Sequence, residues 1–301
     1  MLFLAGLMGL MAVSAVVYVD VGGETEGDIL SGTDGDDTLT GGDGDDQIGA
    51  YDGDDLVDAG AGNDDLHGSG GDDTLDGGTG NDTLHGDDGA DDIFGGADDD
   101  QIAGHNDDDV IHGEAGNDSL QGSAGDDVLY GEAGDDALLG GLDDDMLHGG
   151  TGQDTLFGGW GDDTLSGIVD DPDTAGPDDI DVADYLNGGG GDDVIVAGRG
   201  DIVTAGDGAD QVILGDWIDG GAAELLDFDQ REDSLLFVWD DSAEEAGEPE
   251  ISVISNPEDT SQMQIVMGSQ VVATVSADSG VTPGDIALIP LSTAQNLGFI
   301  N

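Results

Sequence analysis

Residues 71–84 read GDDTLDGGTGNDTL and contain one short unit twice, with its aliphatic residue at Leu75 and again at Leu84. The unit is G-x-x-G-[DN]-D-x-U-x, where U is Ile, Leu or Val, and it recurs every nine residues from Gly27 to Ser166. A fixed period this short predicts a stacked repeat architecture, which decides how the rest of the chain is interpreted.

Two positions of the unit are filled in the same way in all sixteen copies. An aliphatic residue occupies U, and an aspartate stands two residues before it. The aliphatic residues are Leu30, Leu39, Ile48, Val57, Leu66, Leu75, Leu84, Ile93, Ile102, Ile111, Leu120, Leu129, Leu138, Leu147, Leu156 and Leu165. Because side chains alternate along a strand, x-U-x points U inward and its two neighbours outward.

The period fixes a simple geometry for residues 26–167. We expect a six-residue Gly/Asp turn followed by a three-residue strand in each unit, so that two units make one 18-residue coil. Two short parallel sheets would then stack at about 4.8 Å per coil, and eight coils would form a rod of about 38 Å. One aliphatic residue per unit is a thin core, because ordering nine residues is entropically costly.

The charge balance restricts the partners. The chain has 301 residues, with 72 Asp and Glu against 2 Lys and Arg, and a formal net charge of −70. Nucleic acid is excluded as a partner because no basic surface is available for phosphates. A disordered acidic chain is the alternative, but the periodic aliphatic position argues against it. Multivalent cations are the natural partners of such a chain.

The motif resembles the RTX (hemolysin-type) calcium-binding repeat G-G-x-G-x-D-x-U-x, and the resemblance covers residues 26–215. It implies an all-β fold, a right-handed parallel β-roll that binds many Ca²⁺ ions. It also implies an exported bacterial protein, secreted or attached to the cell surface, that folds when it meets calcium. Some similar rolls bind ice through regular ranks of Thr and Asn. The third turn position here is mixed, from Asp43 to Ala61 and Gly70, so we do not expect ice binding.

Bound calcium would stabilise a roll with a thin core and would neutralise the carboxylates that stack from coil to coil. Ca²⁺ takes about six to eight oxygen ligands, and aspartates and turn carbonyls of adjacent coils can supply them. The predicted metal ligands are Asp28, Asp37, Asp46, Asp55, Asp64, Asp73, Asp82, Asp91, Asp100, Asp109, Asp118, Asp127, Asp136, Asp145, Asp154, Asp163, Asp184, Asp193, Asp201 and Asp210. The alternative is that these aspartates lie in turns and are simply solvated, but solvated aspartates would not need to recur every nine residues.

Several units depart from the pattern. The glycine four residues before U is replaced by Glu26, Asp98, Asp107 and Asp143. The second residue of the turn, often glycine, is Tyr51, Asp87, His105, Glu114 or Glu132 in other units. If these positions need a positive φ, the turns are strained, and we expect the weakest calcium sites near residues 97–109 and 143.

The chain on either side of the repeats differs from them. Residues 1–25 include an uncharged apolar run, 2–19, which is read as a membrane anchor or a secretory signal, with a buried or irregular segment as the alternative. Residues 168–185 are an acidic insert, and a second, degenerating repeat segment follows at 186–216. Residues 217–301 are predicted to form an antiparallel β cap over the roll and to include a candidate type I secretion signal. Without cysteine, the chain gives no disulfide evidence of its compartment.

The sequence does not favour an enzyme. It contains no H-E-x-x-H, G-x-S-x-G or P-loop motif. His67, His85, His112 and His148 each follow an inward aliphatic residue and His105 falls in a turn, so outward polar side chains are preferred over a transition-metal site. We expect a structural or adhesive calcium-binding protein. A fragment or partner of an RTX enzyme or toxin, and an extracellular calcium buffer, are the alternatives.

One outer face of the rod is predicted to be a contact surface. Residues 18 apart lie one coil apart, so apolar and ring side chains should line up on a surface that is otherwise acidic. This ring patch comprises Phe94, Val110, His112, Val128, Tyr130, Met146 and His148. A protein partner or self-association would use it. The alternative is that β-propensity alone selects these residues, or that the insert or the cap covers them.

Overall fold

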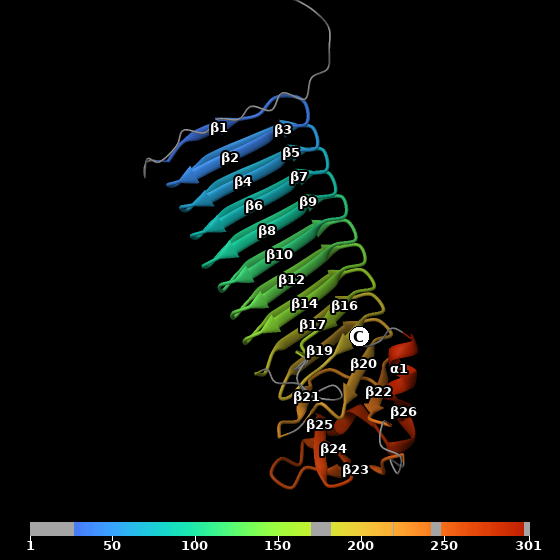
Figure 1. Ribbon diagram of the computed structural model, residues 1–301. Helices are drawn as coiled ribbons and strands as arrows, with labels where there is room; N and C mark the ends of the chain where they lie inside the picture. Colours follow the sequence, from blue (N-terminus) through green and yellow to red (C-terminus); the bar gives the residue numbers. More distant parts are fainter. Residues whose placement is uncertain (1–26, 170–181, 219, 242–247, 298–301) are drawn as a thin grey trace, which may run out of the picture.

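The computed structural model describes residues 27–169, 182–218, 220–241 and 248–297, and within these ranges it is a two-sheet β-solenoid (Figure 1). The apolar run 2–19 lies outside the described residues. Odd-numbered strands form one 14-stranded sheet and even-numbered strands a 12-stranded sheet, apart from the C-terminal strands. Successive strands therefore alternate between the sheets, as predicted for a roll with two units per coil.

The first sheet runs in the order β1 (Ile29–Ser31), β3 (Gln47–Asp52), β5 (Asp65–Gly70), β7 (Thr83–Asp88), β9 (Gln101–Asn106), β11 (Ser119–Ala124), β13 (Ala137–Leu142), β15 (Thr155–Trp160), β17 (Tyr185–Gly190), β19 (Ile202–Asp207), β21 (Ala223–Leu225), β25 (Gln270–Ser276), β24 (Gln262–Met267) and β23 (Ile251–Ser255). The second sheet runs in the order β2 (Thr38–Asp43), β4 (Leu56–Ala61), β6 (Thr74–Thr79), β8 (Asp92–Ala97), β10 (Val110–Ala115), β12 (Val128–Ala133), β14 (Met146–Thr151), β16 (Thr164–Ser166), β18 (Val194–Val196), β20 (Gln211–Gly215), β22 (Ser234–Trp239) and β26 (Ile286–Pro290). Two 3₁₀ turns (Ala277–Ser279 and Pro283–Asp285) and the helix α1 (Leu291–Leu297) complete the described elements.

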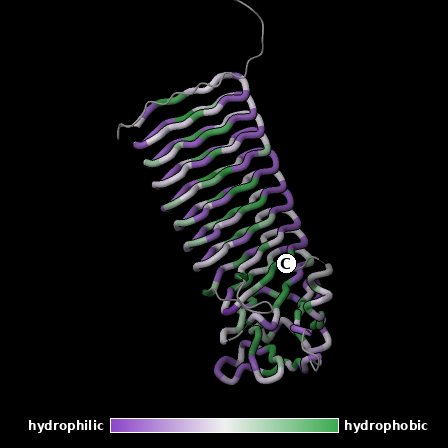
Figure 2. Tube along the Cα trace, viewed as in Figure 1, coloured by the Kyte–Doolittle hydropathy of each residue, from purple (hydrophilic) through white to green (hydrophobic). Residues whose placement is uncertain are grey.

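The repeat register is the one that the nine-residue period predicts. Strands pair in parallel with partners 18 residues apart, as in Leu66 with Leu84 and Leu75 with Ile93. All sixteen aliphatic U residues are buried, and Figure 2 shows them as a hydrophobic stretch in each coil between hydrophilic turns. The core is thus a stack of aliphatic side chains along the rod.

Two details of the predicted unit are wrong. The typical strand is six residues long rather than three, because the residues that follow x-U-x also pair with the next coil, as in β6. A second inward position, two residues after U, is buried as well, usually a glycine but Ala50 and Ala59 in the first coils. The interior is therefore filled from two positions in each unit, and not by one aliphatic residue alone.

The residues that replace turn glycines adopt the strained backbone that the sequence predicts. Asp98, Asp107 and Asp143 have φ values of 81°, 69° and 73°. Tyr51 and His105 have φ values of 80° and 89°. A side chain at positive φ is uncommon, and Asp, Asn and His tolerate it best. The coil path is consequently kept through these units at some local cost in strain.

The insert does not interrupt the stack. After the break, β17 pairs with β15 in register, with Leu186 beside Leu156. Tyr185 already belongs to β17, so the insert ends one residue or more before the predicted 185. The next coil is one residue shorter, since Leu186 pairs with Val203 and Ile195 with Val212. The shortening matches the residue that the sequence lacks between Ile195 and Val203.

The C-terminal region contains the antiparallel strands that the sequence predicts, β23, β24 and β25, and joins them to strands that continue the roll. The strands β21, β22, β25 and β26 extend the two sheets in parallel, and only β23, β24 and β25 pair antiparallel. Trp217 is buried, and its indole Nε1 donates a hydrogen bond of 2.9 Å to the carbonyl oxygen of Ala197. The solenoid core therefore continues past residue 216 and changes gradually into the cap.

Candidate metal centre

The predicted aspartates form two continuous ladders along the corners of the roll. In each ladder the backbone N–H of one aspartate donates to Oδ1 of the aspartate in the next coil. Asp55 N lies 2.8 Å from Asp73 Oδ1, and Asp73 N lies 2.8 Å from Asp91 Oδ1. The same bond continues across the insert from Asp154 to Asp184 and from Asp163 to Asp193. These carboxylates are held in one orientation from coil to coil.

The second oxygen of most ladder carboxylates is buried and lacks a hydrogen-bond partner in the described structure. Such oxygens are Oδ2 of Asp46, Asp55, Asp64, Asp73, Asp82, Asp91, Asp100, Asp109, Asp118, Asp127, Asp136, Asp145, Asp163, Asp193 and Asp210, and Oδ1 of Asp37. Burying an anionic oxygen without a partner is strongly unfavourable. A row of such oxygens therefore fits a row of cations.

Glycine leaves the space in which these oxygens lie. A Cβ on Gly68 would stand 2.3 Å from Asp73 Oδ2 and 2.7 Å from the carbonyl oxygen of Gly86 in the next coil. A Cβ on Gly140 would likewise stand 2.2 Å from Asp145 Oδ2. Carboxylate and carbonyl oxygens of adjacent coils thus share one corner of the interior. Oxygen donors of these two kinds are what calcium takes.

A second, outer ladder shows why charge matters in the inner one. The residue just before the ladder aspartate is Asp or Asn in most units, and its Oδ1 can accept the backbone N–H of the next coil, as Asp54 does from Asp72 at 3.2 Å. Asn63 does the same for Asn81, and Asn117 for Asp135, each at 2.9 Å. Aspartate and asparagine are interchangeable at this position because the hydrogen bond needs only an acceptor oxygen and no negative charge. The inner ladder contains only aspartate, although Asn could make its Oδ1 bond equally well.

Burial makes the inner carboxylates reluctant to ionise on their own. Burial first, and neighbouring carboxylates in addition, raise the pKa of Asp100 to about 7 and that of Asp109 to about 8. The same causes raise the pKa of Asp145 to about 8. Backbone hydrogen bonds to these carboxylates act in the opposite direction but are outweighed. A bound divalent cation would restore the ionised state by supplying the missing positive charge.

The ends of the ladders differ from their middle. Asp28 is partly exposed, and its N–H donates to Asp46 Oδ1. Asp201 Oδ2 accepts a 2.6 Å hydrogen bond from Gly198 N. One ladder also runs further than predicted, because Asp210 N donates to Asp233 Oδ1 at 3.3 Å. Asp233 was missed although Asp233-Ser234-Leu235 repeats the D-x-U signature, since 23 residues separate Leu235 from its partner Val212.

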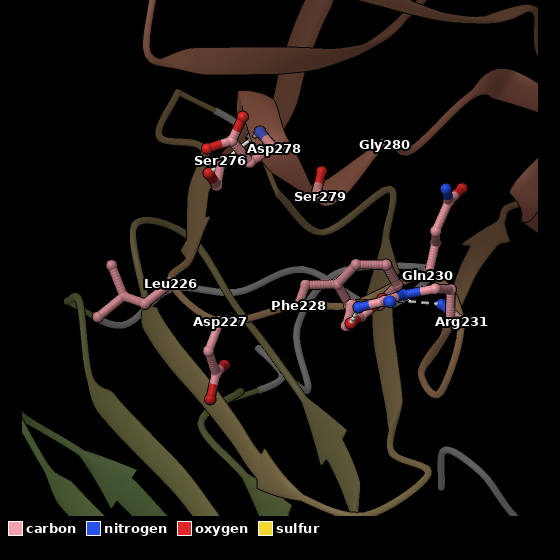
Figure 3. Close-up of a pocket in the computed structure, with 10 residues that line it drawn as sticks. Leu226, Asp227, Phe228, Gln230, Arg231, Ser276, Asp278, Ser279 and Gly280 are labelled. Atoms are coloured by element: carbon pink, nitrogen blue, oxygen red, sulfur yellow. Dashed lines mark hydrogen bonds and ion pairs between the residues drawn. The ribbon is translucent and has the colours of Figure 1, made fainter.

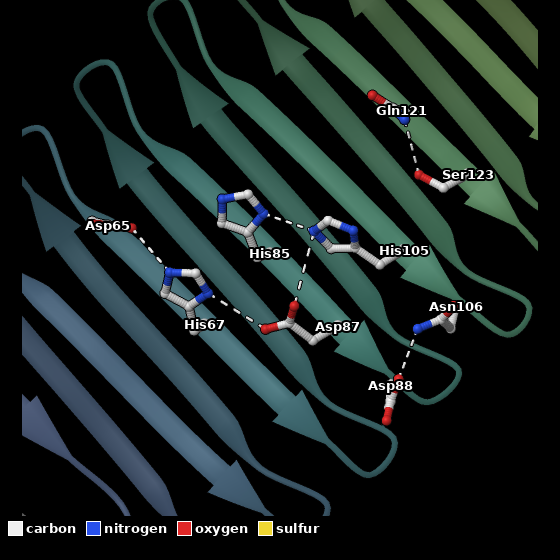
Figure 4. A network of polar contacts seen from close by, with 9 residues as sticks. All are labelled: Asp65, His67, His85, Asp87, Asp88, His105, Asn106, Gln121 and Ser123. Carbon is white, nitrogen blue, oxygen red and sulfur yellow. Dashed lines mark hydrogen bonds and ion pairs between the residues drawn. The ribbon is translucent and has the colours of Figure 1, made fainter.

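The histidines follow the predicted outward arrangement, but they gather in two groups. His67, His85 and His105 lie together on the outer face of the first sheet (Figure 4). On the second sheet the rings of Phe94, His112, Tyr130 and His148 stack one above another, with centroids 4.9, 4.9 and 5.2 Å apart. Val110, Val128 and Met146 pair beside them in successive strands. The seven residues of the ring patch are therefore contiguous, as predicted.

The cap contains an open hollow of about 340 Å³ (Figure 3). It is lined by Leu226, Asp227, Phe228, Asp229, Gln230, Arg231, Ser276, Asp278, Ser279 and Gly280. The Arg231 guanidinium hydrogen-bonds the Asp229 carboxylate, which lowers the pKa of Asp229 to about 2. Asp229 and Arg231 form an ion pair, and the hollow also has the carboxylates of Asp227 and Asp278, so it combines a guanidinium with carboxylates where the ladders have carboxylates alone.

Two other kinds of feature are absent from the described residues. No three His, Asp or Glu side chains there already converge as in a preformed metal cluster. No helix in the same residues is long and apolar enough to cross a membrane. The ladders offer one carboxylate per unit together with backbone carbonyls instead, a donor set spread over successive coils.

A family model described as the RTX calcium-binding nonapeptide repeat (4 copies) matches residues 22–167 in overlapping segments and residues 183–201. The matches together span more than half of the chain. Among curated proteins, none matches the sequence. A solved structure of a hyperactive, Ca²⁺-dependent, β-helical antifreeze protein from an Antarctic bacterium is similar at 22% identity, with a TM-score of 0.27. The alignment covers 73% of this chain and 75% of that one, and proteins this weakly alike need not share a function.

Proposed function

Because the chain belongs to the family of RTX calcium-binding nonapeptide-repeat proteins, whose repeats bind calcium, we propose that calcium along its two aspartate ladders drives the roll to fold. The folded rod then acts outside the cell as a structural or adhesive element. The observation that carries this proposal is the row of buried ladder oxygens that accept no hydrogen bond.

The ladder aspartates hold the ions in this proposal. Each Ca²⁺ takes carboxylate oxygens and turn carbonyls from two adjacent coils, since one coil alone offers too few oxygens for six to eight ligands. The ligand set comprises the twenty aspartates from Asp28 to Asp210 that the nine-residue phase predicts, and Asp233 is added to it. Folding and metal binding are then one equilibrium, because the sites exist only when coils are stacked.

Far-UV circular dichroism with and without calcium tests the proposal. In excess chelator at neutral pH, residues 27–215 should lose their β spectrum, because a net charge of −70 is left uncompensated around a thin core. Adding calcium should restore the spectrum in a cooperative transition. A β spectrum that is the same in chelator and in calcium would contradict the proposal.

An extracellular position follows from the same chemistry. RTX repeat proteins are typically bacterial and extracellular, and calcium is scarce in the cytosol and plentiful outside. An unfolded chain would therefore cross the envelope and fold on arrival. Protease digestion of intact cells of the source organism, followed by immunoblotting, should remove a surface-attached rod, or the protein should be found in the medium. Protection from the protease inside intact cells would count against export.

We place self-association at the ring patch, with a second copy of the rod as its occupant. The patch has the coil spacing of the roll, so a second copy presents rings at the same interval and the two stacks can pack along their length. Its seven residues carry no carboxylate, so two copies meet here with less repulsion than elsewhere on an acidic rod. A defined contact surface also favours a structural protein over a simple calcium buffer.

A double change tests the patch. Phe94→Ser with Tyr130→Ser should weaken self-association of the calcium-loaded rod by at least tenfold, measured by sedimentation velocity, and leave calcium-driven folding intact. Phe157→Ser is the matched control, because Phe157 is an exposed aromatic residue on the other sheet. A double variant that associates as the unchanged protein does would remove the patch from the proposal.

A further inference from the structure

The first sheet contains a stretch without charge, on a chain whose net charge is −70. The strands β11, β13, β15 and β17 follow one another in this sheet and contain no charged residue. Three aromatic residues, Phe157, Trp160 and Tyr185, are exposed on it. We propose that these three rings bind a neutral polysaccharide, with each ring stacked on a sugar unit. The inference deepens the adhesive role proposed above, and it rests on that role only for a folded, calcium-loaded rod.

The three aromatic residues lie in a row that crosses two adjacent coils. Phe157 pairs with Asn187 of the next strand, and Tyr185 stands two residues before Asn187 on the same outward side. The strand spacing and the rise per residue place the Cα atoms of Phe157 and Tyr185 about 8 Å apart. Trp160 follows Phe157 by three residues in β15. A row of separate rings suits an extended polymer, because each ring can meet a different unit of that polymer.

Glycines beneath the rings support two of them and leave their outer surfaces open. A Cβ on Gly190 of the next coil would stand 3.4 Å from Cε3 of Trp160, so the indole lies against backbone that carries no side chain. The rest of the indole faces solvent, since Trp160 is 70% exposed. Gly159 is buried, whereas its partner Gly141 in the preceding coil is only partly buried, which indicates that Phe157 and Trp160 cover Gly159 from either side. These two rings are therefore held against the strand and remain accessible from outside.

Neutral hydrogen-bonding groups stand beside two of the rings. Thr155 pairs with Tyr185, and Asn187 pairs with Phe157. Within the described residues, neither the Thr155 hydroxyl nor the Asn187 amide is engaged in a hydrogen bond. Both groups can donate and accept. A sugar ring presents C–H groups on its faces and hydroxyl groups around its edge, so an aromatic ring beside an amide or a hydroxyl matches both parts of a sugar.

The charge pattern favours a neutral chain over charged partners. An acidic polysaccharide or an anionic membrane would find no cation on this face, and it would meet the acidic turns beside it, which include Asp143, Asp144 and Asp162. A basic protein would be attracted to those turns rather than to the uncharged strands. Exposed apolar surface of this kind usually marks a binding site, and a neutral polysaccharide can occupy it without electrostatic repulsion.

Affinity electrophoresis of the full-length protein in calcium tests the proposal. The native gels contain hydroxyethyl cellulose, glucomannan or dextran as neutral chains, and carboxymethyl cellulose as the acidic counterpart of the first. At least one neutral chain should retard the unchanged protein, and carboxymethyl cellulose should not. Trp160→Ala with Tyr185→Ala should weaken the binding at least tenfold, whereas Phe94→Ser with Tyr130→Ser, on the other sheet, should leave it unchanged. No retardation by any neutral chain, equal retardation by carboxymethyl cellulose, or equal binding by the first double variant would overturn the proposal.

Tryptophan fluorescence gives a second readout that needs no variant. Trp160 is well exposed, whereas Trp217 is buried and Trp239 is partly buried. Acrylamide should therefore quench mainly Trp160, and a bound neutral polysaccharide should reduce that quenching. Unchanged quenching in a chain that retards the protein would place the binding elsewhere and contradict the proposal.

Sedimentation velocity of Trp160→Ala with Tyr185→Ala covers the remaining occupant, a second copy of the rod. Self-association should be unchanged, and its loss together with unaltered polysaccharide binding would assign this surface to a protein contact instead. Circular dichroism in calcium reports the folding of each variant separately. Loss of polysaccharide binding by a folded rod is therefore distinguishable from failure of calcium-driven folding.

Discussion

At the scale of single residues, two neighbouring positions separate hydrogen bonding from metal binding. Asp126 and Asp127 are adjacent, and Oδ1 of each accepts a backbone N–H from a neighbouring coil. Asp126 belongs to the exposed outer ladder, in which Asn63 and Asn117 do the same work. Asp127 is 1% exposed, and its Oδ2 has no hydrogen-bond partner. Only the second position should need a negative charge.

Asp127→Asn should therefore destabilise the roll in calcium and stabilise it in chelator. With calcium, a ligand shared by two adjacent sites is lost, at a cost of about 1–3 kcal/mol in unfolding free energy. Without calcium, the same change removes a buried carboxylate whose pKa burial raises to about 6. Thermal unfolding under both conditions measures the sign. Asp126→Asn is the control, and it should change the unfolding free energy by no more than a few tenths of a kcal/mol under either condition.

An unchanged stability in calcium, or an equal effect at the two positions, would show that position 127 serves only in hydrogen bonding, because Asn keeps the Oδ1 acceptor. The comparison needs no knowledge of how many ions are bound.

At the scale of the elements, the ladders make the calcium-free roll sensitive to pH. The pKa of Asp73 and of Asp193 is raised to about 7, mainly by burial. An aspartate with a raised folded pKa contributes stability that is fully present below its unfolded value near 4 and is lost as pH rises through the folded value. In chelator the roll should thus fold near pH 5 and unfold as pH rises through about 6 to 8.

Circular dichroism during a pH titration in chelator measures this transition. In calcium the order reverses, because protons compete with the ions for the same oxygens, and calcium affinity should fall as pH drops below 7. A calcium-free protein that is folded at pH 8 and unfolds on acidification would contradict the prediction.

The end of one ladder gives another prediction at this scale. Asp233 joins the ladder of Asp210 to the cap, and its Oδ2 also accepts a 2.7 Å hydrogen bond from Asp229 N. Asp233→Ala should raise the calcium concentration needed for folding, because it removes the last carboxylate of the ladder that runs through Asp210. Asp278→Ala, at an exposed position beside the hollow, is the control. If Asp233→Ala leaves the calcium concentration at the folding midpoint unchanged, the cap does not depend on the ladder for folding.

The repeat predicted the elements far better than it predicted their ends. The phase of U and of Asp two residues earlier gave the strand order and the buried residues, because both follow from spacing alone. Strand length was underestimated, since hydrogen bonding along turn glycines leaves no mark in the hydropathy pattern. Asp233 was missed because its D-x-U signature stands out of phase. The grouping of His105 with His85 depends on a positive φ, which a residue type only suggests.

At the scale of the whole molecule, the number of ions distinguishes a ladder from an isolated site. If each ion joins two coils, the sixteen units between Gly27 and Ser166 offer roughly 14 sites. Equilibrium dialysis with atomic absorption should find a stoichiometry of that order. One or two ions per chain would refute the ladder.

The pairing of every coil only with its neighbours has a mechanical consequence. The strands lie across the rod, and coils are joined by backbone hydrogen bonds and, when loaded, by calcium (Figure 1). Tension along the axis would therefore separate one coil from the next in sequence, instead of shearing a whole sheet at once. Such a rod gives way stepwise and lengthens under load, and calcium concentration sets the force at which each step occurs. A tether built in this way would absorb mechanical energy by lengthening, and the calcium concentration of the medium would set the force that it resists.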